Sequence, residues 1–203
     1  MMKFSKYVTL VVFALVMVGC QTTTQYIDST DQKTNITAGL SNADFEQAAQ
    51  EAIEEMIVSP LLVHPNAQGG GRYVIAVSDI TNDTMQRIST EQIAKKIRVG
   101  LLQSGKFLAS SAIGANKDSL VTESRKMQES SIVNKSTAKG NNIIMPDFSL
   151  SGTIIQRVNS LDSGDQKIEY YFQLTLTNID NGLAYFESET VIGKVADGST
   201  VSW

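Results

Sequence analysis

The chain has 203 residues, of which 42% are hydrophobic, and this length and composition fit one ordinary domain with appendages and exclude wholesale disorder. A single cysteine excludes an intrachain disulfide, and with a single histidine the chain lacks the ligand sets of structural zinc and haem sites. The formal net charge of −4 and the sequence pI near 5.0 provide no basic surface for a phosphate backbone, so nucleic acid is not expected as a partner.

The first 20 residues predict a lipoprotein signal. Lys3 and Lys6 precede an apolar run of about 12 residues, which is shorter than the roughly 20 that cross a bilayer as a helix. Gly19 stands directly before Cys20, as in the bacterial lipobox, and this resemblance implies cleavage before Cys20 and acylation of its thiol. The alternative is a buried free cysteine in an uncleaved helix. Gln21 in place of aspartate resembles the signal of lipoproteins sorted to the outer membrane, facing the periplasm.

The segment from residue 20 to residue 40 predicts a flexible tether, because it is rich in Thr, Gln, Asn, Asp and Ser and has few large apolar side chains. Some 20 residues of this kind span roughly 25 Å on average and about 70 Å when fully extended. The expected organisation is therefore a signal peptide at residues 1–19, a tether at residues 20–40 and one globular domain at residues 41–203.

The first half of the domain predicts helices alternating with short strands. A helix capped by Ser41 or Asn42 has apolar residues at helical spacing and ends before Pro60. A strand is expected over residues 72–80, a helix from Ser89 to about residue 104, a short strand over 107–109 and a helix over 118–133. The three glycines at 69–71 precede a strand and no Lys-Ser/Thr pair follows them, so a phosphate-binding loop is not expected. Residues 130–142 are too polar to assign.

The second half predicts an antiparallel meander. Apolar and polar residues alternate over 148–155, 167–177 and 183–192, which is typical of half-buried strands. Asn181-Gly182 between the last two runs is a strong hairpin signal. The same alternation predicts that Tyr170 and Tyr171 face opposite sides of the sheet.

The residues available for catalysis are few. Cys20 is committed to lipid, and His64 is the only imidazole and has no triad or Ser-x-x-Lys motif around it. The acidic pairs Asp79 with Asp83 and Glu187 with Glu189 are explained more simply as solvated residues and edge protection. We therefore expect no enzyme activity, no cofactor and no catalytic metal.

A binding surface is expected on loops and on the sheet. The loop after the first strand is a candidate because connecting loops often carry function, and Tyr and Arg on the sheet are candidates because they are enriched at interfaces. The candidate residues are Asn82, Asp83, Thr84, Arg87, Arg157, Tyr171 and Tyr185.

Four segments together resemble the LpoB family of penicillin-binding-protein activators. They are residues 75–84, 102–107, 146–154 and 171–182, and the resemblance covers roughly residues 42–193. It implies a small α/β (α+β) domain with a mixed or antiparallel sheet of about four strands packed by three to four helices. This fold is similar to the amino-terminal domain of TolB and to the curli-secretion lipoprotein CsgG.

The resemblance also implies a function. A member of the family would be an outer-membrane lipoprotein that docks on a bifunctional penicillin-binding protein of the inner membrane and stimulates its glycan polymerisation and peptide cross-linking. The alternative, from the likeness to CsgG, is a periplasmic accessory or assembly lipoprotein of a secretion or surface organelle system.

Overall fold

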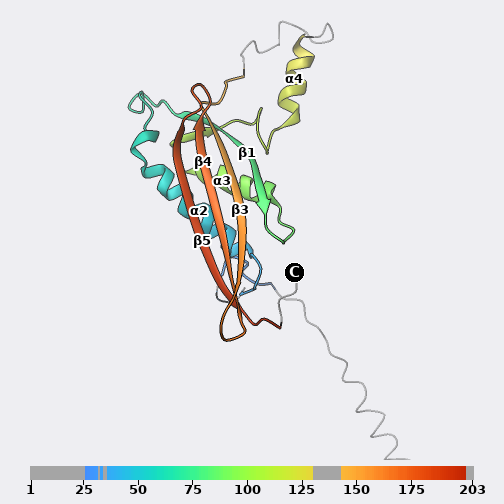
Figure 1. The fold of residues 1–203 in the computed structure, drawn as a ribbon. Coiled ribbons are helices and arrows are strands. Elements are labelled where there is room, and N and C mark those ends of the chain that lie inside the picture. The colour runs from blue at the N-terminus through green and yellow to red at the C-terminus, as the bar shows by residue number, and fades with distance from the viewer. Residues whose placement is uncertain (1–25, 32, 34–35, 130–142, 200–203) are drawn as a thin grey trace, which may run out of the picture.

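The computed structural model describes residues 26–31, 33, 36–129 and 143–199 (Figure 1). The elements in chain order are α2 (Asn42–Val58), the 3-10 helix η1 (Pro60–Leu62), β1 (Tyr73–Asp83), α3 (Thr90–Gln103), β2 (Phe107–Ala109), α4 (Ser119–Glu129), β3 (Phe148–Ser160), β4 (Gln166–Asn178) and β5 (Ala184–Ala196). The predicted signal peptide, Cys20 and the unassigned residues 130–142 lie outside the described residues.

One mixed sheet forms the centre of the fold, with its strands in the order β2-β1-β3-β4-β5. β1 pairs in parallel with both β2 and β3, whereas β3, β4 and β5 form the predicted antiparallel meander. The predicted fold class is confirmed. The sheet has five strands where about four were expected, because the short predicted strand at 107–109 pairs with the start of β1 and extends the sheet.

The helices begin where the sequence predicts. At α2 the Ser41 hydroxyl accepts from the Asp44 N–H at 3.3 Å and the Asp44 carboxylate accepts from the Ser41 N–H at 2.6 Å, which completes a capping box. At α3 the Ser89 hydroxyl accepts from the Gln92 N–H at 3.4 Å. Within the described part of the chain, no helix has both the length and the apolar character needed to cross a membrane.

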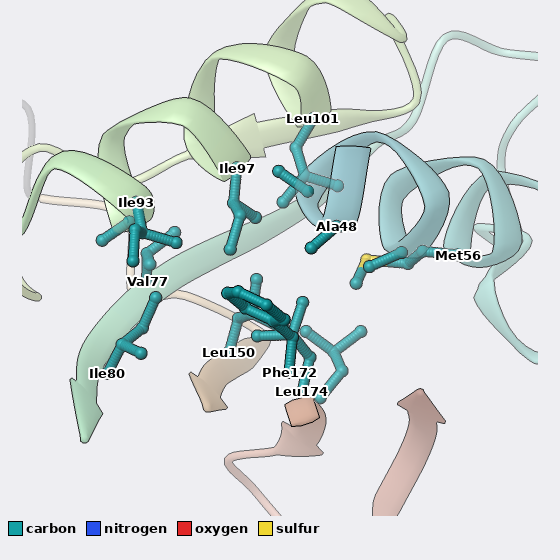
Figure 2. Close-up of a cluster of buried hydrophobic side chains, with 14 of the residues drawn as sticks. Ala48, Met56, Val77, Ile80, Ile93, Ile97, Leu101, Leu150, Phe172 and Leu174 are labelled. Atoms are coloured by element: carbon teal, nitrogen blue, oxygen red, sulfur yellow. The ribbon is translucent and has the colours of Figure 1, made fainter. Parts of the chain in front are cut away.

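The core lies between one face of the sheet and the helices α2 and α3 (Figure 2). Along β4 every second side chain from Ile168 to Leu176 is buried, so Tyr170 lies in the core while Tyr171 points to the other side, as predicted. Ile93, Ile97 and Leu101 of α3 point at the sheet in Figure 2. Figure 1 shows α2 and α3 on the same side of the sheet and α4 standing away from it.

The long strands give the domain two ends. We call one end the N-terminal pole: it contains the last residues of β1, β3 and β5 and the first residues of β4. Residues 36–41 and the loop 84–88 also lie there. We call the opposite end the distal pole: it contains the first residues of β1, β3 and β5 and the last residues of β4. The 3-10 helix η1 contacts β5 there.

Candidate functional site

At the N-terminal pole, the residues just before α2 are hydrogen-bonded to the sheet. The Tyr170 hydroxyl donates to the Ala38 carbonyl at 3.2 Å, and Gln86 donates to that hydroxyl at 2.8 Å while its side-chain oxygen accepts from the Leu40 N–H at 2.9 Å. Burial raises the pKa of Tyr170 to about 12, and the negative charge of Asp44 adds to the rise, whereas the hydrogen bond from Gln86 opposes it. Residues 38–40, expected within the tether, are thus held by the domain.

A buried ion pair lies beside this contact. The Lys194 ammonium of β5 is 2.6 Å from a carboxylate oxygen of Asp44 in the first turn of α2, and 14% of the Lys194 side chain and 8% of the Asp44 side chain are exposed. The same ammonium donates to the Gly39 carbonyl at 2.6 Å. The Lys194 ammonium on the edge strand β5 therefore binds both the start of α2 and the segment that leads into it. An inward-pointing charge of this kind also discourages pairing of an edge strand with another chain.

The predicted loop residues build this pole. The Asn82 amide donates to the Gln86 carbonyl at 2.8 Å, and the Thr84 hydroxyl donates to the Asn82 side-chain oxygen at 2.8 Å. Asn82 and Thr84 are therefore positioning residues for Gln86, which the sequence analysis did not select. Asp83, between them in the chain, and Arg87, which follows Gln86, are exposed.

The sheet face that points away from α2 and α3 carries two further predicted residues. The Arg157 guanidinium lies 5.5 Å from the centre of the Tyr171 ring, in a cation-π contact. Asp83 pairs in register with Ile155, two residues before Arg157, so the structure brings Asp83, Arg157 and Tyr171 to the same part of this face. Beside them the Gln173 amide donates to the Glu189 carboxylate at 2.7 Å.

The distal pole contains a row of stacked rings. Centroid distances are 4.9 Å from His64 to Tyr73, 4.9 Å from Tyr73 to Phe148 and 5.2 Å from Phe148 to Tyr185, all edge-to-face. Tyr185, a predicted binding residue, is half-buried in this row and lies far along the sheet from Tyr171. Nδ1 of His64 accepts from the Asn66 N–H at 3.0 Å, which gives the histidine a role in its own turn.

Large apolar side chains are exposed at the same pole. They come from the η1 segment, the approach to β3 and the turn between β4 and β5, and they are Leu61, Val63, Ile144, Met145, Ile179 and Leu183. We call these six residues the distal apolar cluster. The sequence alone does not predict it, because apolar residues next to strand ends look like core residues until their exposure is known.

Small-molecule or metal chemistry has little support among the residues that the structure describes. They contain no group of three or more His, Cys, Asp or Glu side chains arranged to hold a metal ion.

A groove of about 610 Å³ runs between α2 and α3, with Ile53 and Val99 in its lining and Glu46 paired to Lys96 at its rim. The predicted acidic residues Glu187 and Glu189 are exposed on β5.

The described residues form a small α+β domain with one five-stranded mixed sheet. The chain belongs to the LpoB family, because the family model described as peptidoglycan-synthase activator LpoB matches residues 44–192, more than half of the chain. The resemblance to the LpoB family seen in the sequence is confirmed. No curated protein sequence matches the chain.

Solved structures with similar folds include members of the same family. The LpoB C-terminal domain from Salmonella enterica is 16% identical and the match covers 73% of this chain and 98% of that one, with a TM-score of 0.46. The LpoB C-terminal domain from Escherichia coli is 13% identical over 74% of this chain and 99% of that one, with a TM-score of 0.48. The NMR structure of Escherichia coli LpoB is 15% identical, and the match covers 87% of this chain and 83% of that one, with a TM-score of 0.43.

Proposed function

We propose that this chain is an outer-membrane lipoprotein, facing the periplasm, that binds a bifunctional penicillin-binding protein of the inner membrane and activates its synthesis of peptidoglycan. The family match over residues 44–192 carries the proposal, because it covers almost all of the described helices and strands. The lipid anchor at Cys20, the cleaved signal at residues 1–19 and the outer-membrane location rest on the lipobox resemblance and on Gln21.

Activation in this proposal is non-catalytic. A protein that binds the active state of a synthase more tightly than the inactive state shifts the population toward activity by that difference in affinity. A tenfold shift requires about 1.4 kcal/mol of differential binding. A rigid domain with defined contact surfaces is suited to this role, and it needs no catalytic residue of its own.

The test uses the full-length protein in detergent micelles and the bifunctional penicillin-binding proteins of the same bacterium, each purified and supplied with lipid-linked wall precursor. The rate of glycan polymerisation should rise severalfold as the protein is added at micromolar concentration, and peptide cross-linking should follow. The protein incubated with precursor alone controls for activity of its own. Absence of both binding and stimulation with every synthase would contradict the proposal.

A further inference from the structure

The two poles of the domain are separated by most of the length of the long strands. β4 has 13 residues, and a strand rises about 3.3 Å per residue, so its ends are about 40 Å apart. Because Ala38, Gly39 and Leu40 are bonded at the N-terminal pole, the chain enters the domain at that end. In Figure 1 this is the end of the sheet away from α4. The distal pole is the part of the sheet that lies farthest from this attachment.

The distal apolar cluster is fixed in place by hydrogen bonds between neighbouring segments. The Asp147 carboxylate accepts from the Val74 N–H at 2.7 Å, and the Asp147 carbonyl accepts from the Ile179 N–H at 3.0 Å. The residues before β3, which include Met145, are thereby tied to the start of β1 and the end of β4. The Leu183 carbonyl accepts from the Asn178 N–H at 2.9 Å and closes the adjoining turn.

A row of aromatic rings lies at the same pole. It runs from His64 to Tyr185 across β1, β3 and β5, and Phe148 at its centre is completely buried. Backbone segments that are already fixed in place lose little conformational freedom when a partner covers them, which favours binding. Exposed apolar residues gathered in one region mark an interaction site more often than scattered ones do.

We infer that the distal apolar cluster is the surface that docks on the synthase, and this inference rests on the proposed function. A partner anchored in the opposite membrane approaches from the side away from the tether. The 18 residues from Cys20 to Thr37 reach about 60 Å when fully extended, and only contact through the distal pole adds the roughly 40 Å length of the sheet to that reach. The occupant is therefore an apolar surface on the periplasmic part of an inner-membrane peptidoglycan synthase.

A second copy of this chain fits the cluster less well. Two domains joined through their distal poles would place their N-terminal poles at opposite ends of a complex about 80 Å long, by the same rise per residue. Both copies would be anchored in one membrane, so such a complex would lie along that membrane and both clusters would be covered. Neither copy could then use its cluster to contact a partner in the opposite membrane, as the proposed function requires.

The experiment compares two pairs of exposed apolar residues, one at each pole. The distal pair is Met145→Ser with Leu183→Ser, whose parent side chains are 64% and 61% exposed. The control pair is Met85→Ser with Val195→Ser at the N-terminal pole, where the parent side chains are 72% and 66% exposed. Both pairs remove one Met and one branched side chain. Full-length proteins in detergent micelles are titrated against each purified bifunctional penicillin-binding protein of the same bacterium, with thermal unfolding as a check of folding.

The distal pair should weaken the dissociation constant at least tenfold and reduce stimulation of the synthase, while the control pair stays within twofold of the natural protein. Equal effects of the two pairs, or a larger effect of the control pair, would overturn the inference and leave the proposed function standing. Sedimentation showing a dimer that Met145→Ser with Leu183→Ser dissociates would overturn it in favour of a second copy. If the natural protein binds no synthase, both the proposed function and this inference fail.

Discussion

The two poles are held together by different kinds of interaction. At the N-terminal pole, directional polar contacts join segments as far apart in sequence as Leu40 and Gln86, 46 residues, or Gly39 and Lys194, 155 residues. At the distal pole, a row of ring contacts and buried apolar surface is added to the hydrogen bonds of Asp147 with Val74 and Ile179. Polar contacts at the N-terminal pole fix where residues 38–40 attach. At the distal pole, buried apolar residues stabilise the fold, and the distal apolar cluster stays exposed for a partner.

The largest expected effect is at the distal pole. Phe148→Ala removes a completely buried ring that contacts both Tyr73 and Tyr185, and we expect the free energy of unfolding to fall by about 4 kcal/mol. Urea denaturation measures the change. Tyr171→Ala on the open sheet face is the matched aromatic control and should cost clearly less. Equal losses in the two variants would mean that the ring row does not stabilise this pole.

The next effect is at the N-terminal pole. Asp44→Ala leaves the buried ammonium of Lys194 without its counter-charge, and we expect a loss of about 3 kcal/mol in the free energy of unfolding. Lys194→Met keeps most of the apolar stem and removes the charge. Combined with Asp44→Ala, it should restore at least about 1 kcal/mol relative to the sum of the two single changes. Strict additivity in the urea midpoints would show that the two charges are not coupled.

A smaller effect on the free energy of unfolding is expected at high pH, where Tyr170 of the N-terminal pole loses its proton. The pKa of Tyr170 is about 12 in the folded chain and about 10 when unfolded, so between these values the folded chain binds more protons and its stability falls as pH rises. This contribution is complete below pH 10, and about 2 kcal/mol of it is lost as the pH approaches 12. Urea denaturation of the natural protein and Tyr170→Phe at pH 8 to 12 measures it.

Two comparisons make the pH test specific. Tyr170→Phe should cost about 1 kcal/mol at pH 8, because its hydrogen bonds with Ala38 and Gln86 are lost, and should show a shallower alkaline decline than the natural protein. Tyr171→Phe changes the neighbouring hydroxyl on the other face and should keep the natural slope. Parallel curves for all three proteins would contradict the assignment of this decline to Tyr170.

Local patterns in the sequence were sufficient for most elements of the fold. Ser41 and Ser89 marked the helix starts, Asn181-Gly182 marked the hairpin, and alternation placed Tyr170 and Tyr171 on opposite faces, because each of these features depends on residues close in sequence. The position of β1 between β2 and β3 could not be obtained in this way. It depends on pairing between strands whose partners, such as Ile75 and Phe148, are far apart in sequence.

The candidate surfaces were harder to predict than the fold. Tyr185 lies at an irregularity in the β4-β5 register, between the pairs Leu176 with Phe186 and Thr177 with Ala184, and simple alternation cannot show that its ring packs on Phe148. Residues such as Gln86 and Lys194 have no local signature, since their partners come from distant segments. Exposure of the distal apolar cluster likewise depends on where the strands end.

The attachment of residues 38–40 determines how a pull on the N-terminal segment would be distributed. Tension along that segment reaches the Ser29 carbonyl, which accepts from the Asn42 amide at the start of α2, and then the hydrogen bonds from Tyr170 and Lys194. Tyr170 and Lys194 belong to the adjacent antiparallel strands β4 and β5, so the sheet takes part of the load. Helix α2 and the sheet would therefore bear such a pull together.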